Sequence, residues 1–169
     1  MKKIILILLA FSVLMAAGCS RKQSGTAGDQ SGAAGETFEL ALVTDLGTID
    51  DKSFNQGSWE GLVQYASEKN ISHKYYQPAE QSDDAYLSAI GLAVTGGAKV
   101  IVTPGFLFET PVFIAQDRYP NVNFILVDGS PHNADYTDFK TGPNTVGVHY
   151  AEDQAGFLAG YAAVKDGNR

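Results

Sequence analysis

Cysteine is almost absent from this 169-residue chain, whose only one is Cys19. A single cysteine excludes an internal disulfide framework and a zinc site built from several thiolates. An excess of positive charge is also lacking, because the formal net charge is −7 and two of the lysines, Lys2 and Lys3, lie at the very N-terminus. Such an acidic chain is poorly suited to bind nucleic acid or an anionic membrane through charge.

Motifs of the commonest catalytic and metal sites are missing as well. The histidines His73, His132 and His149 form neither an H-E-x-x-H nor an H-x-x-E-H frame. The pair Asp50-Asp51 lacks the alternating oxygen ligands and the glycine of an EF-hand loop. No G-x-S-x-G elbow and no P-loop occurs in the sequence. We therefore expect no catalytic residue, no metal and no cofactor.

The N-terminus has the pattern of a targeting segment, residues 1–19. Residues 1–3 are basic, residues 4–15 form an apolar run too short to span a bilayer comfortably, and small residues lead to Cys19. The pattern resembles a bacterial lipoprotein signal, although Ala16 stands where leucine is more usual. We expect cleavage before Cys19 and a lipid there that anchors the protein at the extracytoplasmic face of a cell membrane. An ordinary secretory leader with a coincidental cysteine is the alternative.

The remaining chain divides into a linker and one globular domain. Residues 20–36 are rich in glycine, serine and other small or polar residues, which is typical of a flexible linker. Residues 37–169 then alternate apolar strand patterns with helical ones. The expected strands cover residues 38–43, 72–77, 99–103, 123–127 and 145–150. This alternation predicts an α/β fold with a doubly wound parallel sheet, and analogy suggests the strand order 2-1-3-4-5.

Helix starts are marked by polar residues followed by periodic apolar ones. Ser53 with Gln56 three residues later has the spacing of a capping box, so a helix should begin near Phe54. Thr110 before Pro111 predicts an N-cap followed by proline in the first turn. The loop before Phe54 joins a strand to a helix, and it should therefore lie at the carboxyl edge of the sheet, where such sheets bind ligands.

Two aspartates directly follow apolar strands. Asp45 and Asp128 should both lie at that carboxyl edge, where a carboxylate can accept hydrogen bonds from the N–H or hydroxyl groups of a ligand. Each lies close before a glycine, so a purely structural turn role is the alternative. Phe54 falls outside the apolar stripe of its helix, which favours an exposed ring, whereas Trp59 belongs to the stripe and is expected in the core.

The sequence resembles the basic membrane protein family, which comprises substrate-binding lipoproteins of ABC transporters and includes purine nucleoside receptors. The resemblance rests on the leader and on residues 45–61, 102–106, 124–129 and 155–161. Members of the family have two α/β lobes in a type I periplasmic-binding-protein-like arrangement. The resemblance thus implies that residues 37–169 are the N-terminal lobe and that the second lobe is missing from this chain.

The resemblance also implies a function and a set of ligand-binding residues. Asp45 and Asp128 match the base-binding aspartates of the family, and Phe54 matches the aromatic residue that stacks on the purine. Asn55 lies beside Phe54, and Phe106 follows a third strand, so both are further candidates. The implied partners are a permease and an ATPase subunit. The alternatives are riboflavin or a sugar as the ligand or, from a different class of protein, a nucleoside-hydrolysing enzyme.

Overall fold

The computed structural model describes residues 38–167. The expected leader, the linker and Cys19 lie outside the described residues. The elements in chain order are β1 (Leu40–Val43), α2 (Phe54–Lys69), β2 (His73–Tyr76), α3 (Asp83–Thr95), β3 (Val100–Pro104), the 3-10 turn η1 (Phe106–Phe108), α4 (Glu109–Arg118), β4 (Asn123–Val127), β5 (Thr145–Val148) and α5 (Glu152–Lys165). These bounds agree with the predicted strands to within about two residues at each end, the usual disagreement between boundary definitions.

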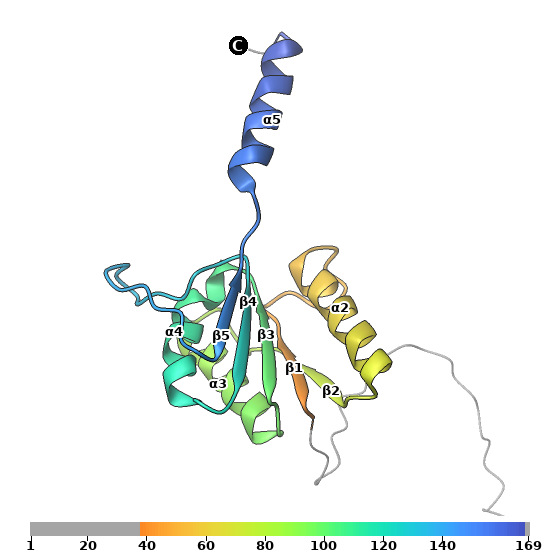
Figure 1. The fold of residues 1–169 in the computed structure, drawn as a ribbon, viewed down its shortest axis with the longest axis vertical. Helices are drawn as coiled ribbons and strands as arrows, with labels where there is room; N and C mark the ends of the chain where they lie inside the picture. The colour runs from red at the N-terminus through yellow and green to blue at the C-terminus, as the bar shows by residue number, and fades with distance from the viewer. Residues whose placement is uncertain (1–37, 168–169) are drawn as a thin grey trace, which may run out of the picture. The chain divides into compact units, whose positions relative to one another are not determined.

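The five strands form one parallel sheet in the order β2-β1-β3-β4-β5 (Figure 1). Both the doubly wound α/β fold and the order expected by analogy are confirmed. The polar strand β2 lies at one edge of the sheet, where a half-buried strand is tolerated. Because all strands run in one direction, their carboxyl ends meet at one edge, which we call the carboxyl edge.

The central strand β1 is buried on both faces. Ala41 and Val43 pack with α3 and α4, whereas Leu40 and Leu42 pack with α2 on the other face. This alternation follows from the two-residue period of a strand, and burial on both faces explains why β1 reads as a continuous apolar run. The end of β1 is thereby fixed in the core, and it holds the loop that follows in a defined position.

Part of the sheet face beside α2 remains open among the described residues. Val146 and Val148 of β5 are 55% and 37% exposed. A hollow of about 410 Å³ opens between α2 and the sheet. It is lined by Leu40, Ser58, Leu62, Tyr65, Val100, Val102 and Ile125.

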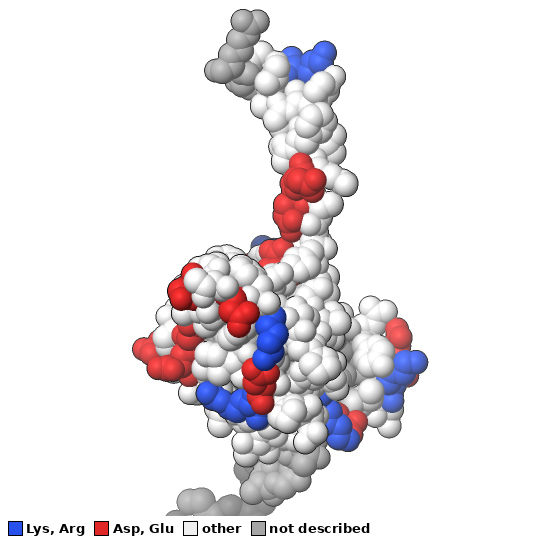
Figure 2. All heavy atoms as spheres, turned by 60° about the vertical axis from the view of Figure 1, so that its left-hand side comes forward, with Lys and Arg blue, Asp and Glu red and all other residues white. Residues whose placement is uncertain are grey.

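Helix α5 is exposed over its whole length. Its acidic first turn and Lys165 near its end carry its only charges, so the helix between them is nearly uncharged (Figure 2). None of the helices within residues 38–167 has the length and apolar character needed to cross a membrane.

The predicted start of α4 was wrong. Thr110 is not the N-cap, because the helix already begins at Glu109. Gly105 has a φ of 100°, and the Phe108 amide donates to its carbonyl oxygen at 3.1 Å, which winds the chain into η1. Since η1 runs directly into α4, the helix needs no side-chain cap at its start.

Candidate ligand-binding site

The structure places all five predicted ligand-binding residues at the carboxyl edge. Asp45 follows β1, Asp128 follows β4 and Phe106 lies in η1 after β3, while Phe54 and Asn55 begin α2. Parallel strands and the loops between strand and helix bring these residues together, although they are distant in sequence. Their contact with a ligand stays a prediction.

The β1–α2 loop, residues 44–53, is closed around the side chain of Asp45. Its Oδ1 accepts hydrogen bonds from the Gly47 amide at 2.7 Å and from Asn55 Nδ2 at 2.6 Å. A Cβ at Gly47 would lie 2.7 Å from Asn55 Nδ2 and 2.8 Å from Asp45 Oδ1, so a larger residue does not fit without displacing them. Asp45 therefore does have a turn role, but both of these bonds end on Oδ1 and leave Oδ2 for another donor.

The capping box predicted at Ser53 was wrong in its partners. The Ser53 side chain makes no capping bond; instead Asp51 Oδ1 accepts from the amides of Ser53 at 2.8 Å and Gln56 at 3.0 Å. Gln56 Oε1 accepts from the Lys52 amide at 3.0 Å rather than from the cap residue. Lys52 has a φ of 57°, which turns the chain so that the carboxylate of Asp51, which precedes the N-cap residue Ser53, reaches the amides at the start of α2.

The charge of Asp51 is stabilised in this position. Burial tends to raise the pKa of its carboxyl group, but the hydrogen bonds from the Gln56, Ser53 and Asn55 amides outweigh burial, and the net pKa is lowered. An ionised carboxylate at the N-terminus of α2 also interacts favourably with the helix dipole. Asp51 thus fixes the shape of the loop.

Two buried polar atoms near Asp45 lack a hydrogen-bond partner. Asn55 and Tyr86 are each 2% exposed, yet Asn55 Oδ1 and the Tyr86 hydroxyl make no hydrogen bond within the described part of the chain. Burial raises the pKa of Tyr86, and the charge of Asp45 raises it further, so this hydroxyl lies within electrostatic reach of Asp45. Buried polar groups normally have a partner, so Asn55 Oδ1 is an unused acceptor and the Tyr86 hydroxyl an unused donor.

An aromatic pair lies next to these polar atoms. Phe54 is 43% exposed, as its position outside the apolar stripe predicted, and its ring centroid lies 6.2 Å from that of Tyr150 at an angle of 43°. Sequence reasoning missed Tyr150, although an aromatic residue just after a strand is a usable signal. Phe106 is 67% exposed. Trp59 is half-buried and contacts Tyr75 edge-on, in agreement with its predicted place in the core.

Asp128 has an unusual backbone and an acidic environment. Its φ is 66°, and its amide donates to the Val148 carbonyl oxygen at 2.8 Å. Burial raises the pKa of the Asp128 carboxyl group, and Glu152 raises it further, while His149 acts in the opposite direction. His149 Nε2 in turn lies 3.3 Å from Ser130 Oγ. These neighbours were not foreseen from the sequence, because most of them come from residues 148–152, at the other end of the loop that follows Asp128.

The carboxyl edge has no metal-binding arrangement among residues 38–167: no group of three or more His, Cys, Asp or Glu side chains there could hold an ion. The donors and acceptors described above suit a small organic molecule with polar edges and a flat apolar face.

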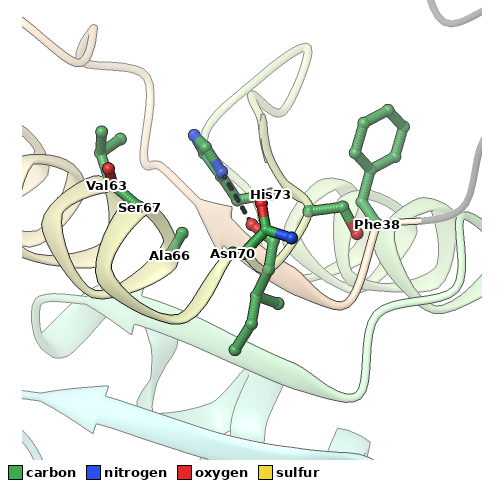
Figure 3. Close-up of a pocket in the computed structure, with 8 residues that line it drawn as sticks. Phe38, Val63, Ala66, Ser67, Asn70 and His73 are labelled. Carbon is green, nitrogen blue, oxygen red and sulfur yellow. Dashed lines mark hydrogen bonds between the residues drawn. The ribbon is translucent and has the colours of Figure 1, made fainter.

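The hollow in Figure 3 lies at the opposite edge of the sheet. It has a volume of about 710 Å³ and is lined by Phe38, Val63, Ala66, Ser67, Asn70, Ile71, Ser72 and His73. Its lining comes from the end of α2 and from residues that lead into β1 and β2. His73 Nδ1 points toward the Ile71 carbonyl oxygen at 3.4 Å. This hollow is therefore at the amino edge, away from the predicted ligand residues.

An open parallel sheet with polar and aromatic side chains at its carboxyl edge defines the class of α/β ligand-binding lobes. The family model described as "ABC transporter substrate-binding protein PnrA-like" matches residues 38–167. The chain belongs to this family.

Curated relatives and a solved structure agree with this assignment. The "ABC transporter nucleoside-binding protein BmpA" of Lactococcus lactis subsp. cremoris is 32% identical over 159 residues, 91% of this chain and 41% of the relative. "Basic membrane protein A" of Borreliella burgdorferi is 28% identical over 98% of this chain and 43% of its own length. A crystal structure of ABC transporter solute-binding proteins from Aeropyrum pernix K1 has the same fold, with a TM-score of 0.59 at 24% identity over 73% of this chain and 31% of that one.

The chain spans about two fifths of the length of these curated relatives. The family, the Lactococcus relative and the Aeropyrum structure are described as binding proteins rather than enzymes, in agreement with the expectation from the sequence.

Proposed function

We propose that the protein captures a purine nucleoside at the carboxyl edge for uptake by an ABC transporter. The observation that supports this most directly is the unpartnered, buried Asn55 Oδ1 beside the Asp45 carboxylate and the exposed Phe54 ring. Two acceptors next to an aromatic face complement a purine, which offers N–H donors on its edge and a flat π-surface. The Lactococcus relative, named as nucleoside-binding, belongs to the same family and adds support.

Each residue has a role in this proposal. Asp45 and Asn55 accept hydrogen bonds from the base, and Phe54 stacks on its face. Asp128 supplies a second carboxylate for the base or the ribose, and Phe106 borders the site at the end of β3. The family-wide arrangement of two lobes leads us to propose that a second lobe covers the other side of the ligand and that hinge closure presents the complex to the permease.

The setting of the protein follows from the same proposal. Cleavage of the leader and lipidation of Cys19 would hold it at the extracytoplasmic face of the membrane, next to the permease and ATPase subunits. Two further relatives, from Pyrococcus horikoshii and Pyrococcus furiosus, are named as lipoproteins, which supports a lipid anchor.

Calorimetric titration tests the ligand class. The protein would run from residue 36 to the natural end of its reading frame, and the ligands would be inosine, guanosine, adenosine, cytidine, riboflavin, ribose and galactose. We expect binding of the purine nucleosides and a loss of about tenfold or more in Phe54→Ala, because stacking on one aromatic ring contributes roughly 1–3 kcal/mol per base. Tyr65→Ala is the matched control, since it removes another exposed ring of α2.

Each other result has a defined meaning. Binding of riboflavin or a sugar alone overturns the purine assignment and supports the second ligand class. Equal losses in Phe54→Ala and Tyr65→Ala overturn the stacking role. Release of free base from a nucleoside during the titration, followed by chromatography, would instead support the hydrolase alternative.

A further inference from the structure

Glu109, the first residue of α4, holds the chain segment that follows Asp128. Its Oε1 accepts from the Ser130 amide at 2.9 Å, and its Oε2 lies 3.1 Å from His132 Nε2. Both oxygens of one carboxylate are thus used by residues two and four positions after Asp128. The Glu109 side chain is 19% exposed and that of His132 is 3% exposed, so solvent screens this pair only weakly.

His132 is itself fixed by its surroundings. Its Nδ1 lies 2.7 Å from the Asn133 carbonyl oxygen, which can only accept, so Nδ1 carries a proton. The ring stacks on Tyr136 with centroids 4.0 Å apart and contacts Phe139 at 5.2 Å. Glu109 is therefore bonded to a histidine that is itself held by a hydrogen bond and by two aromatic rings of the same loop.

Asp128 needs such support because of its backbone. A φ of 66° is costly for a residue with a Cβ, of the order of 1–2 kcal/mol, unless neighbours hold it. The adjacent Gly129 packs directly on Glu109: a Cβ there would lie 2.9 Å from Glu109 Cγ. The amide of the strained aspartate is thus held by the Val148 carbonyl oxygen, and Glu109 holds the Ser130 amide two residues further on.

We propose that Glu109, braced by His132, is a positioning residue that fixes the Asp128 carboxylate at the carboxyl edge. This inference rests on the proposed function, in which Asp128 binds the nucleoside. In this proposal Glu109 does not touch the ligand. It affects affinity only by keeping the Asp128 carboxylate in position.

A double-mutant cycle tests this proposal, with inosine as the probe. It uses the same protein as the titration, from residue 36 to the natural end of the reading frame. Glu109→Ala should weaken binding about tenfold, a coupling typical of residues in direct structural contact. In an Asp128→Ala background the same change should cost less than about twofold. Glu109→Gln should restore most of the affinity, because the amide keeps an acceptor for Ser130 and offers a donor to His132.

The matched control is Asp117→Asn. Asp117 also lies on α4 and binds the same loop at Lys140, near the end of the loop that leads into β5, and both side chains are exposed. The Asp117→Asn variant should bind inosine with unchanged affinity. Equal losses for Glu109→Ala in both backgrounds, or no rescue by Glu109→Gln, would overturn the positioning role.

Amide hydrogen exchange supplies a readout that needs no ligand. Glu109→Ala should speed exchange of the Ser130 and Asp128 amides at least about tenfold while leaving the β1 amides protected. Unchanged exchange overturns the proposal even if affinity falls. If the unaltered protein binds no nucleoside, the proposed function fails, whereas the exchange result still decides whether Glu109 holds Asp128.

Discussion

The two loops that present the predicted ligand carboxylates are built in opposite ways. In the β1–α2 loop, Asp45 is held by Gly47 and Asn55, which are 2 and 10 positions away in the sequence. In the β4–β5 loop, residues 128–144, the support comes from Glu109, 21 positions before Ser130 and 23 before His132. The first loop is closed by residues that lie near it in the sequence, and the second is closed by the start of a helix distant in sequence.

This difference extends to electrostatics. The β1–α2 loop surrounds Asp51 with amide donors, which lower the pKa of its carboxyl group. In the β4–β5 loop, burial raises the pKa of the Asp128 carboxyl group, and the nearby Glu152 and Glu109 raise it further. The first loop therefore stabilises its negative charge, and the second accumulates negative charge that a ligand with N–H or O–H donors would relieve.

The largest expected effect comes from breaking the hydrogen bond that the buried Asn55 donates to Asp45, which closes the β1–α2 loop. Asn55→Leu removes the hydrogen bond to Asp45 and leaves a partly buried carboxylate oxygen with one donor fewer. We expect the free energy of unfolding to fall by about 3 kcal/mol, measured by urea denaturation, because an unsatisfied charged group costs more than a neutral one. Gln64→Leu on the exposed side of α2 is the control and should change stability by less than about 0.5 kcal/mol. A small effect of Asn55→Leu would show that the loop is not closed by this bond.

The next prediction compares one tightly packed glycine from each of the two loops, Gly47 and Gly129. Gly47→Ala should cost about 2 kcal/mol, since the new methyl group meets the hydrogen-bonded atoms of Asn55 and Asp45. Gly129→Ala should cost about 1 kcal/mol, because it meets the Glu109 side chain, which can shift. Gly61→Ala, with open space around its Cβ inside α2, should instead stabilise by about 0.5–1 kcal/mol. The reverse order of the first two costs would contradict the view that the local loop is the more rigid one.

The opposite pKa shifts predict opposite pH dependences. Asp51→Ala should lower stability by about 1 kcal/mol at pH 7, as for a lost helix cap. Because the folded-state pKa of Asp51 lies below the unfolded value of 3.8, this loss should persist above that value and vanish as the pH falls through the folded pKa.

Asp128→Asn should act in the other direction. The folded-state pKa of Asp128 is raised above 3.8, so its ionised form lowers stability at neutral pH, and the amide should make the protein more stable there. This gain should shrink as the pH falls through the raised pKa and disappear below 3.8. Urea denaturation between pH 3 and pH 7 measures both variants. Parallel curves for the two variants would contradict the opposite shifts.

The same contrast explains how much of the site could be predicted. The position of Asp45, Phe54 and Asn55 at the carboxyl edge could be predicted because strand, loop and helix follow one another in the sequence. Sequence spacing indicated the right N-cap position, Ser53, but the wrong capping side chain, since nothing in a linear pattern shows that a turn at Lys52 brings Asp51 to the helix start. The support of Asp128 by Glu109 depends on packing between separate elements, which sequence periodicity does not contain.

The smallest effect concerns the far end of the second loop. Lys140 Nζ lies 2.5 Å from Asp117 Oδ2, and the two side chains are 44% and 62% exposed. An exposed ion pair contributes little after solvent screening and the loss of side-chain entropy, so Lys140→Met should change the free energy of unfolding by less than about 0.5 kcal/mol. If the β4–β5 loop is held mainly by Glu109, the Lys140–Asp117 pair should contribute little to stability. Thermal unfolding at low and high salt checks this, because a loss above about 1 kcal/mol that salt removes would mean that the charged pair, too, holds the loop in place.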